Sequence, residues 1–258
     1  MKRSRLPLYT TLAVLLFFYL PIAVLVINSF NGSRFEGGWG GFSWRWYERL
    51  WHERDIWHAF GNSLLVAVTA TVAATAIGTL AAIAMHRYQS RLQRLHYSLI
   101  YAPLVVPEIL MGMSLLLLFV ALGVNLGLGT IILAHVTFCI SFVTLVVLAR
   151  LQDFDYSIVE ASLDLGANWW VTTWRVLIPM LAPGILAGGL LAFTLSIDDF
   201  VVTFFVAGPG ATTLPIQVYS MIKHGSTPLI NALSTLLLVA TFALVTAAQW
   251  LTGESIKT

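Results

Sequence analysis

Three carboxylates interrupt long uncharged stretches of this chain, and they are the residues best placed to do chemistry. Glu108 lies within residues 95–149, and Asp198 and Asp199 lie within residues 176–222. A charge at the centre of a bilayer costs about 2.5–3.5 kcal/mol on the insertion scale. Neither stretch contains a Lys or Arg that could offset this cost by pairing. Such acids must be protonated, border a wet cavity, or meet a cation that arrives from outside.

The third condition fits a cationic substrate. A di- or polyamine needs separated carboxylates for its ammonium groups and aromatic faces for cation–π contact. Pro103 and Pro107 predict a kink that would form a polar pocket around Glu108. Asp198 and Asp199 are adjacent, so on a helix their side chains lie roughly 100° apart. We therefore expect one to line the path and the other to bond to a neighbouring helix or help at a kink. The alternative is that all three acids are structural, serving helix packing or a subunit interface.

Two further residues are candidates for the same path. Ser196 precedes Asp198 by two positions and could supply a hydroxyl group. Trp46 is a candidate to receive the cation on the outer side, in a loop, residues 31–57, that holds five of the nine tryptophans. These tryptophans are also typical of an interfacial aromatic belt, and the loop could instead be a docking lid for an outside partner. The candidate substrate-path residues are therefore Glu108, Asp198, Asp199, Ser196 and Trp46.

The elements that must position these residues are transmembrane helices. The 258 residues are 58% hydrophobic and 10% charged, with a mean hydropathy of +0.84. Soluble domains carry about 45–50% apolar and about 25% charged residues, so an ordinary soluble protein is excluded. One crossing needs about 20 apolar residues. This predicts an all-α membrane protein with spans near residues 8–30, 60–84, 97–122, 130–149, 181–206 and 229–251.

The basic residues predict the orientation of these six spans. An even number of spans puts both termini on one side, and the side with more Lys and Arg in its short loops is the cytoplasm. The terminal side holds nine and the opposite side five, so we expect both termini in the cytoplasm and an uncleaved first span. The nine are Lys2, Arg3, Arg5, Arg87, Arg91, Arg94, Arg150, Arg175 and Lys257, and the five are Arg34, Arg45, Arg49, Arg54 and Lys223.

The cytoplasmic loop of residues 150–179 predicts a compact helix–turn–helix. Ser157 and Glu160 have capping-box spacing at the start of a short helix. Gly166 is placed to end that helix in the left-handed conformation, and Pro179 can open the next one. A small protruding helix–turn–helix of this kind is suited to insert into a cleft on a partner protein. The alternative is an amphipathic helix that lies on the membrane surface. The residues of the candidate coupling surface are Glu160, Ala161, Ser162, Asp164, Gly166 and Pro179.

This loop resembles the EAA loop of the membrane subunits of binding-protein-dependent ABC importers. The shared pattern is Glu160-Ala161-Ser162, three residues, Gly166, nine residues, Val176, one residue, then Ile178-Pro179. Ser162 replaces the second alanine of the family pattern, and Val176 and Ile178 replace other aliphatic residues, all by similar side chains. The resemblance implies that the loop docks into an ATPase subunit.

Other segments are similar to the polyamine branch of this family, the permeases for spermidine and putrescine. They are residues 191–199, residues 208–215 and Asn231-Ala-Leu in the sixth span. The resemblance implies the type I importer (MetI-like) transmembrane fold and a place in the bacterial inner membrane. It also implies three partners: a second permease subunit that completes the pore, two copies of an ATPase that bind ATP and Mg, and a periplasmic polyamine-binding protein. No cofactor is expected in this chain itself.

Other chemistries find little support in the sequence. It lacks a phosphate-binding P-loop, a His-Glu-x-x-His zinc pattern and a Gly-x-Ser-x-Gly elbow. Cys139 is alone, so no intrachain disulfide can form, and the net charge of +2 makes nucleic acid an unexpected partner. His135 is expected to be a satisfied interior residue, with a pore role left open.

Two alternatives stay open. One is a permease for a metal, anion or sugar, of which the acids disfavour the anion. The other is an intramembrane enzyme with Asp198 and Asp199 as an acid dyad, although such dyads usually join separate segments.

Overall fold

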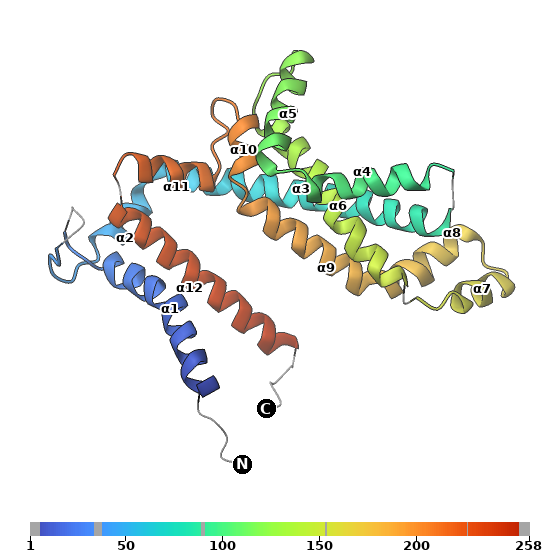
Figure 1. Cartoon of the computed structure of the whole chain (residues 1–258), viewed down its shortest axis with the longest axis horizontal. Coiled ribbons are helices and arrows are strands. Elements are labelled where there is room, and N and C mark those ends of the chain that lie inside the picture. Colours follow the sequence, from blue (N-terminus) through green and yellow to red (C-terminus); the bar gives the residue numbers. More distant parts are fainter. Residues whose placement is uncertain (1–5, 34–37, 89–90, 153, 226, 253–258) are drawn as a thin grey trace. The chain divides into compact units, whose positions relative to one another are not determined.

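The computed structural model describes residues 6–33, 38–88, 91–152, 154–225 and 227–252, and this part of the chain is built of helices and their connections, with one isolated β-bridge between Asn31 and Phe42 (Figure 1). The two termini, whose cytoplasmic placement the sequence predicts, lie outside these residues. The elements are α1 (Leu6–Ser29), α2 (Arg45–His52), α3 (Arg54–Arg87), α4 (Gln93–Val105), α5 (Glu108–Ala121), α6 (Leu128–Gln152), α7 (Ser157–Asp164), α8 (Trp169–Thr172), the π-helical turn η1 (Thr173–Leu177), α9 (Ile178–Ile197), α10 (Val201–Val206), α11 (Leu214–Lys223) and α12 (Thr227–Thr252).

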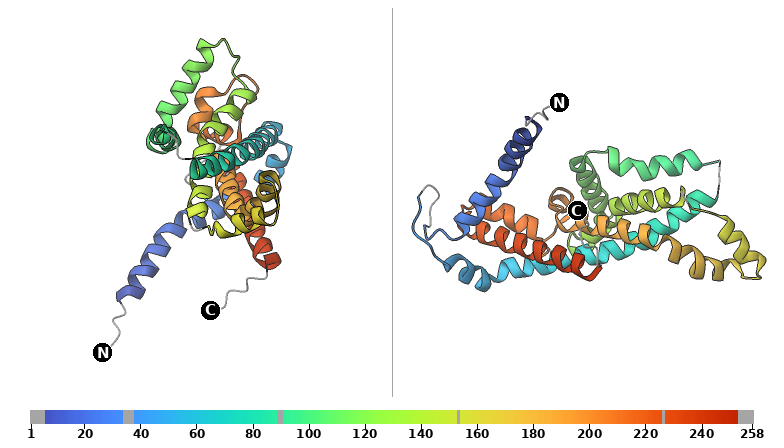
Figure 2. Two further views of the ribbon diagram at one scale, coloured as in Figure 1. Left: turned by 90° about the vertical axis from the view of Figure 1, so that its right-hand side faces the viewer. Right: turned by 90° about the horizontal axis from the view of Figure 1, so that it is seen from below.

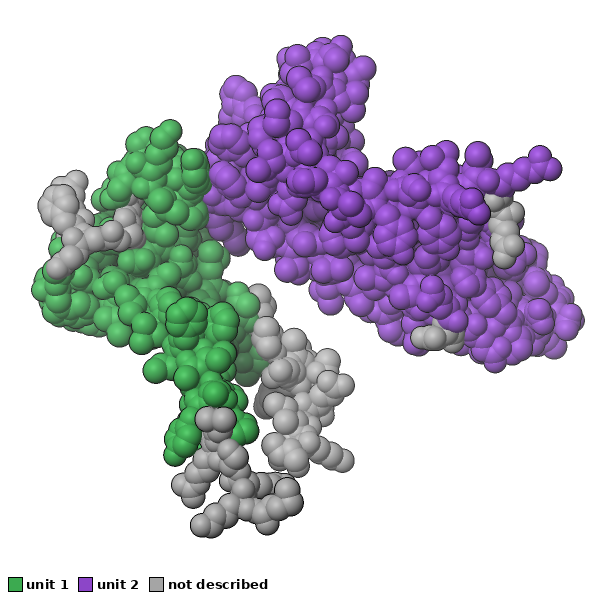
Figure 3. All heavy atoms as spheres, in the orientation of Figure 1, with its two compact units in different colours: residues 1–57, 218–258 green, residues 58–217 purple. Residues whose placement is uncertain are grey.

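The chain divides into two units, coloured separately in Figure 3. One comprises residues 1–57 and 218–258, and the other residues 58–217. In the first, α1 packs on α12, and α12 packs on α2. The apolar side chains of α1 are exposed along its length; Phe17, for example, is 75% exposed. Such a surface is expected of a helix that faces lipid.

Helix α6 is the core of the second unit, and small residues let its neighbours approach closely. A Cβ atom added to Gly78 of α3 would lie 2.9 Å from Val143 of α6, and one added to Gly188 of α9 would lie 3.3 Å from the same residue. The Thr144 hydroxyl donates across this contact to the Gly78 carbonyl at 3.2 Å. Close backbone approach through glycine is typical of packing between membrane helices. These contacts place α3 and α9 against α6.

Two of the predicted spans are interrupted. Helices α4 and α5 meet at Val106-Pro107 with a bend of 111°, which Figures 1 and 2 show from three directions. The kink predicted from the prolines is therefore present, and it is sharp enough to separate two helices. The span predicted near residues 181–206 is broken as well, because α9 ends at Ile197 and α10 begins at Val201. The expectation that Asp198 and Asp199 share one continuous helix is wrong.

Among the described residues, four helices are long and apolar enough to cross a membrane, or five if the bent pair counts as one span. The apolar part of α12 found among the described residues, Pro228–Ala243, is shorter than the about 20 residues that one membrane crossing needs. The predicted all-α membrane fold is confirmed, while the number of six crossings stays a prediction. The four helical segments are Pro7–Ser29, Arg54–Arg87, Leu128–Gln152 and Trp169–Ile197.

Candidate functional site

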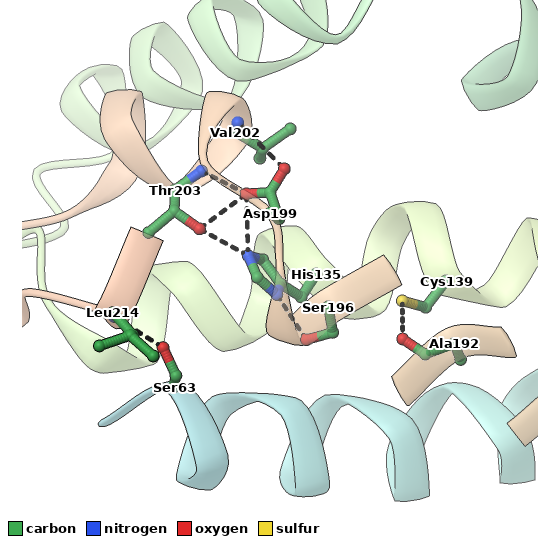
Figure 4. A network of polar contacts seen from close by, with 9 residues as sticks. All are labelled: Ser63, His135, Cys139, Ala192, Ser196, Asp199, Val202, Thr203 and Leu214. Atoms are coloured by element: carbon green, nitrogen blue, oxygen red, sulfur yellow. Dashed lines mark hydrogen bonds and ion pairs between the residues drawn. The ribbon is translucent and has the colours of Figure 1, made fainter. Parts of the chain in front are cut away.

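The break between α9 and α10 is built around the carboxylate of Asp199. Its Oδ2 accepts hydrogen bonds from the Thr203 backbone N–H at 2.8 Å and from the Thr203 hydroxyl at 2.7 Å. Its Oδ1 accepts a longer bond, 3.4 Å, from the Val202 N–H (Figure 4). The first N–H groups of a helix have no partner within the helix, so a carboxylate placed just before them is stabilised. Asp199 therefore binds the first N–H groups of α10, which begins two residues later at Val201.

His135 of α6 completes a buried network with the same carboxylate. Its Nε2 lies 3.3 Å from Asp199 Oδ2 and 2.9 Å from the Thr203 hydroxyl oxygen. Its Nδ1 lies 2.6 Å from the hydroxyl oxygen of Ser196, in the last turn of α9. The His135 side chain is 1% exposed and Ser196 is 4% exposed. The expectation that His135 is a satisfied interior residue is confirmed, and Ser196 faces this network.

The network changes the interpretation of the two aspartates. Asp199 has partners from α6 and α10, so its charge is tolerated without a guest cation. The expectation that one acid of the pair bonds to a neighbouring helix is confirmed for Asp199, whose partner is a histidine of α6 rather than a Lys or Arg. Asp198 differs: it is exposed, and it accepts no hydrogen bond from another residue in the described ranges. Of the pair, only Asp198 presents an uncommitted carboxylate.

Glu108 borders a small cavity beside the same break. It is the first residue of α5, directly after the bend, and its side chain is exposed. The cavity has a volume of about 60 Å³, and Asp199 also borders it. The prolines predict a polar pocket around Glu108; the cavity found beside the bend is lined by two carboxylates and otherwise by apolar residues. Among the described residues, no group of three His, Cys, Asp or Glu could hold a metal ion. The remaining lining residues are Pro103, Met111, Phe138, Phe142, Leu195 and Val202.

Trp46 lies inside the first unit rather than on its surface. The side chain is 3% exposed, and its indole N–H donates to the Asn31 carbonyl at 2.7 Å. The guanidinium of Arg45 already covers its ring, 4.4 Å from the centroid. The neighbouring Trp44 is 56% exposed. This geometry weighs against the expectation that Trp46 receives a cation, because its face and its N–H are both occupied within the chain.

The candidate coupling loop, predicted at residues 150–179, forms the predicted helix–turn–helix with a different cap. Helix α7 begins at Ser157, whose N–H donates to the Asp155 carboxylate at 3.0 Å. Hydrogen bonds from Ser157 lower the pKa of Asp155. The prediction that Ser157 and Glu160 form a capping box is wrong, because no capping hydrogen bond from either side chain is present and the acid two residues earlier satisfies the helix start.

The end of α7 follows the prediction. Gly166 adopts a left-handed conformation with φ +87°, and its N–H donates to the Leu163 carbonyl at 2.9 Å. The next N–H, of Ala167, donates to the Ser162 carbonyl at 3.2 Å. This pair of bonds forms a Schellman-type ending that glycine adopts at low cost. The turn directs the chain into α8, which the Asn168 side chain caps by accepting from the Val171 N–H at 2.9 Å.

The residues of the candidate coupling surface divide into an outer and an inner set. Ser162 faces inward, because its hydroxyl lies 3.0 Å from that of the buried Thr172 and ties α7 to α8. Pro179 is close to the start of α9, as predicted, and continues the loop into that helix through η1. The exposed members are Glu160, Ala161, Asp164, Gly166 and Pro179.

The end of α3 at Arg87 also holds the loop, which the sequence did not predict. The guanidinium of Arg87 lies 3.8 Å from the centroid of the Trp169 ring. The His86 ring stacks on Tyr156 at 5.3 Å with an angle of 4° between the planes. Burial raises the pKa of the Tyr156 hydroxyl. The loop is therefore attached to α3 as well as to α9.

Comparison with known proteins decides the family. Residues 74–253 match the family model described as "Binding-protein-dependent transport system inner membrane component". The chain belongs to this family. It is therefore a transport subunit of the inner membrane, and the intramembrane-enzyme alternative is wrong.

Two curated relatives cover most of the chain. It is 40% identical over 245 residues to the "Spermidine/putrescine transport system permease protein PotC" of Escherichia coli K12, covering 95% of this chain and 93% of the relative. It is 46% identical over 231 residues to the "Putrescine transport system permease protein PotI" of the same strain, covering 87% of this chain and 82% of the relative.

Solved structures agree on the fold. A chain of a bacterial ABC transporter that imports the acidic polysaccharide alginate superposes with a TM-score of 0.74 at 17% identity, covering 96% of this chain and 98% of that one. A chain of the MetNI methionine ABC transporter gives a TM-score of 0.61 at 18% identity, covering 77% and 93%. The predicted type I importer fold is confirmed.

Proposed function

We propose that this chain is one of two permease subunits of an ATP-driven importer of polyamines, and that the substrate cation passes Asp198 and Glu108. The curated relatives support the cargo, since both are polyamine permeases and are 40% and 46% identical to this chain. The observation that carries the path is the asymmetry at the α9–α10 break: Asp199 is bonded to protein while Asp198 is exposed.

The chemistry around the break suits an alkylammonium ion. Asp198 and Glu108 supply carboxylates on two different elements, the end of α9 and the start of α5. The phenyl rings of Phe138 and Phe142 line the cavity that Glu108 borders. Aromatic faces attract cations and pack on methylene groups, so a chain of ammonium and methylene groups finds both kinds of contact here. An anion would be repelled by the same carboxylates.

The coupling loop would transmit the work of ATP hydrolysis. In this proposal the exposed face of α7, with Glu160, Ala161 and Asp164, docks into a separate ATPase, present in two copies, which binds ATP and Mg. Gly166 sets the turn behind this face, Ser162 holds it to α8, and Pro179 continues the loop into α9. A displacement of α7 would therefore reach the α9–α10 break along one nearly continuous helical segment, Trp169–Ile197.

The remaining partners and the orientation belong to the same proposal. A second permease subunit completes the pore, a periplasmic protein delivers the polyamine, and both termini face the cytoplasm. Trp46 is assigned a structural role within the first unit, because its indole N–H and ring face are already engaged.

The test is uptake by the purified complex. The chain is co-purified with its partners, the bound subunits are identified, and uptake of labelled spermidine and putrescine is measured in vesicles. We expect Asp198→Asn and Glu108→Gln to lower uptake while the complex still assembles. Thr194→Val is the matched control, since this exposed residue lies on α9 one turn before Asp198 and its hydroxyl donates to the Leu190 carbonyl of the same helix.

Two results would count against the proposal. Wild-type uptake in both acid variants would remove Asp198 and Glu108 from the path. Transport of an anion, metal ion or sugar in place of either polyamine would show that the cargo is wrong, while leaving the permease assignment intact.

A further inference from the structure

We propose that His135 is a positioning residue of the transport path: it fastens Asp199 at the α9–α10 break and so leaves Asp198 alone to meet the substrate cation. This inference rests on the proposed function and assigns a role to a residue outside the acidic pair and outside the coupling loop. Figure 4 shows the arrangement, in which His135 reaches Ser196 on one side of the break and Asp199 and Thr203 on the other.

The hydrogen bonds in the network are consistent with one neutral tautomer of His135. The Thr203 hydroxyl donates to Asp199 Oδ2 at 2.7 Å, so its oxygen remains free to accept. Nε2–H of His135 donates to that oxygen at 2.9 Å and also faces Asp199 Oδ2 at 3.3 Å. Nδ1 then accepts from the Ser196 hydroxyl at 2.6 Å. A neutral imidazole has one donor and one acceptor, and both are used.

The imidazole links three segments at the break. His135 is on α6, Ser196 lies in the last turn of α9, and Thr203 lies in the first turn of α10. Both aspartates lie between the latter two helices, where the backbone is not held by helical hydrogen bonds. A bond from α6 to each side of the break therefore fixes the direction of the connecting residues. With Asp199 turned into the network, its neighbour Asp198 lies outside it and is exposed.

A second contact also holds α10 against α6. The hydroxyl of Thr130, also on α6, donates to the Val206 carbonyl at the far end of α10 at 2.8 Å. Because α6 holds α10 at both ends, loss of the His135 bonds should loosen the break without detaching the helix. The effect should therefore appear in substrate affinity rather than in assembly or in the use of ATP.

The experiment compares transport kinetics of the whole reconstituted complex with labelled spermidine. His135→Phe keeps a buried ring and removes the hydrogen bonds; we expect the KM for uptake to rise about tenfold, since a hydrogen bond to a charged group is lost. The maximal rate and the number of ATP molecules hydrolysed per spermidine should change less than about twofold. His135→Gln restores an amide donor and acceptor and should recover part of the KM.

A matched control lies one turn further along α6. Cys139 is 0% exposed, and its Sγ lies 3.5 Å from the Ala192 carbonyl of α9, outside the network. Cys139→Ala should leave the KM at the wild-type value. Thr203→Val tests the network from the other side and should raise the KM as His135→Phe does, whereas Thr203→Ser keeps the hydroxyl and should not.

The outcomes separate this inference from the proposed function. If the wild-type complex takes up no polyamine, the cargo is wrong. If it does, and both His135→Phe and Thr203→Val keep the wild-type KM, the positioning role is overturned while the cargo stands. A fall in maximal rate with unchanged KM would also overturn it, because it would indicate a general structural role.

Discussion

Replacing Gly166 by alanine should weaken the coupling of ATP hydrolysis to transport by a predictable amount. Gly166 has φ +87°, and no atom lies within 4 Å of the Cβ that alanine would add. The cost is therefore confined to the backbone, and a left-handed conformation costs a residue with a Cβ about 1–2 kcal/mol. A change of this size lowers the population of the native turn roughly 5- to 30-fold relative to its alternatives.

The assay is the ratio of substrate transported to ATP hydrolysed by the reconstituted complex. Gly166→Ala should lower this ratio several-fold and speed hydrogen exchange in α7 (Ser157–Asp164). Gly166→Asn should be milder, because asparagine tolerates the left-handed region better. Gly123→Ala is the matched control: its φ is +66°, its added Cβ also meets open space, and it follows α5 at the other end of α6 from the loop.

Gly123→Ala distinguishes a specific effect on coupling from a general loss of stability. The control should lose similar stability and keep the wild-type ratio. If both variants show the same transport per ATP, the shape of the α7–α8 turn does not govern coupling.

Three further predictions concern the coupling loop and the core. Arg87→Ala should lower the substrate transported per ATP about two- to fivefold, because it removes the cation–π contact with Trp169. Arg87→Lys should retain part of this contact and therefore part of the transport. Equal transport per ATP in the wild type and both variants would show that α3 takes no part in coupling. Gly78→Ala should destabilise the complex by about 1–3 kcal/mol in thermal unfolding, because its Cβ would meet Val143 at 2.9 Å, and unchanged stability would contradict the close α3–α6 packing. Asp155→Ala should speed hydrogen exchange in α7 at neutral pH, because the carboxylate that binds the helix start is lost. The difference from wild type should disappear as the pH falls through the lowered pKa of Asp155, since the wild-type carboxyl then loses its charge as well. A difference that persists below this pKa would exclude an ionic cap.

The sequence predicted the features that depend on local pattern. The apolar stretches predicted the membrane helices, Pro107 predicted the break before Glu108, and Gly166 predicted the left-handed end of α7. In each case the cause lies in the residue itself: proline lacks an N–H, and glycine lacks a Cβ. These constraints hold regardless of what packs around them.

The features that were missed depend on partners distant in sequence. Ser196 follows His135 by 61 residues, so no local pattern indicates that the imidazole joins α9 and α10. The stretches that hold the acids contain no Lys or Arg, and the histidine that meets Asp199 lies on a different helix, so the local sequence does not identify this partner. Asp155 and Ser157 are both good caps by residue type, and only the folded geometry shows which one binds the helix start.

The most direct test of the central claim is the structure of the complete transporter trapped with a bound polyamine. We predict density for an ammonium group beside the carboxylate of Asp198, with Asp199 still bonded to Thr203 and His135. Density for the polyamine away from Asp198 and Glu108, or Asp199 turned out of the network to bind it, would contradict the division of roles proposed for the two aspartates.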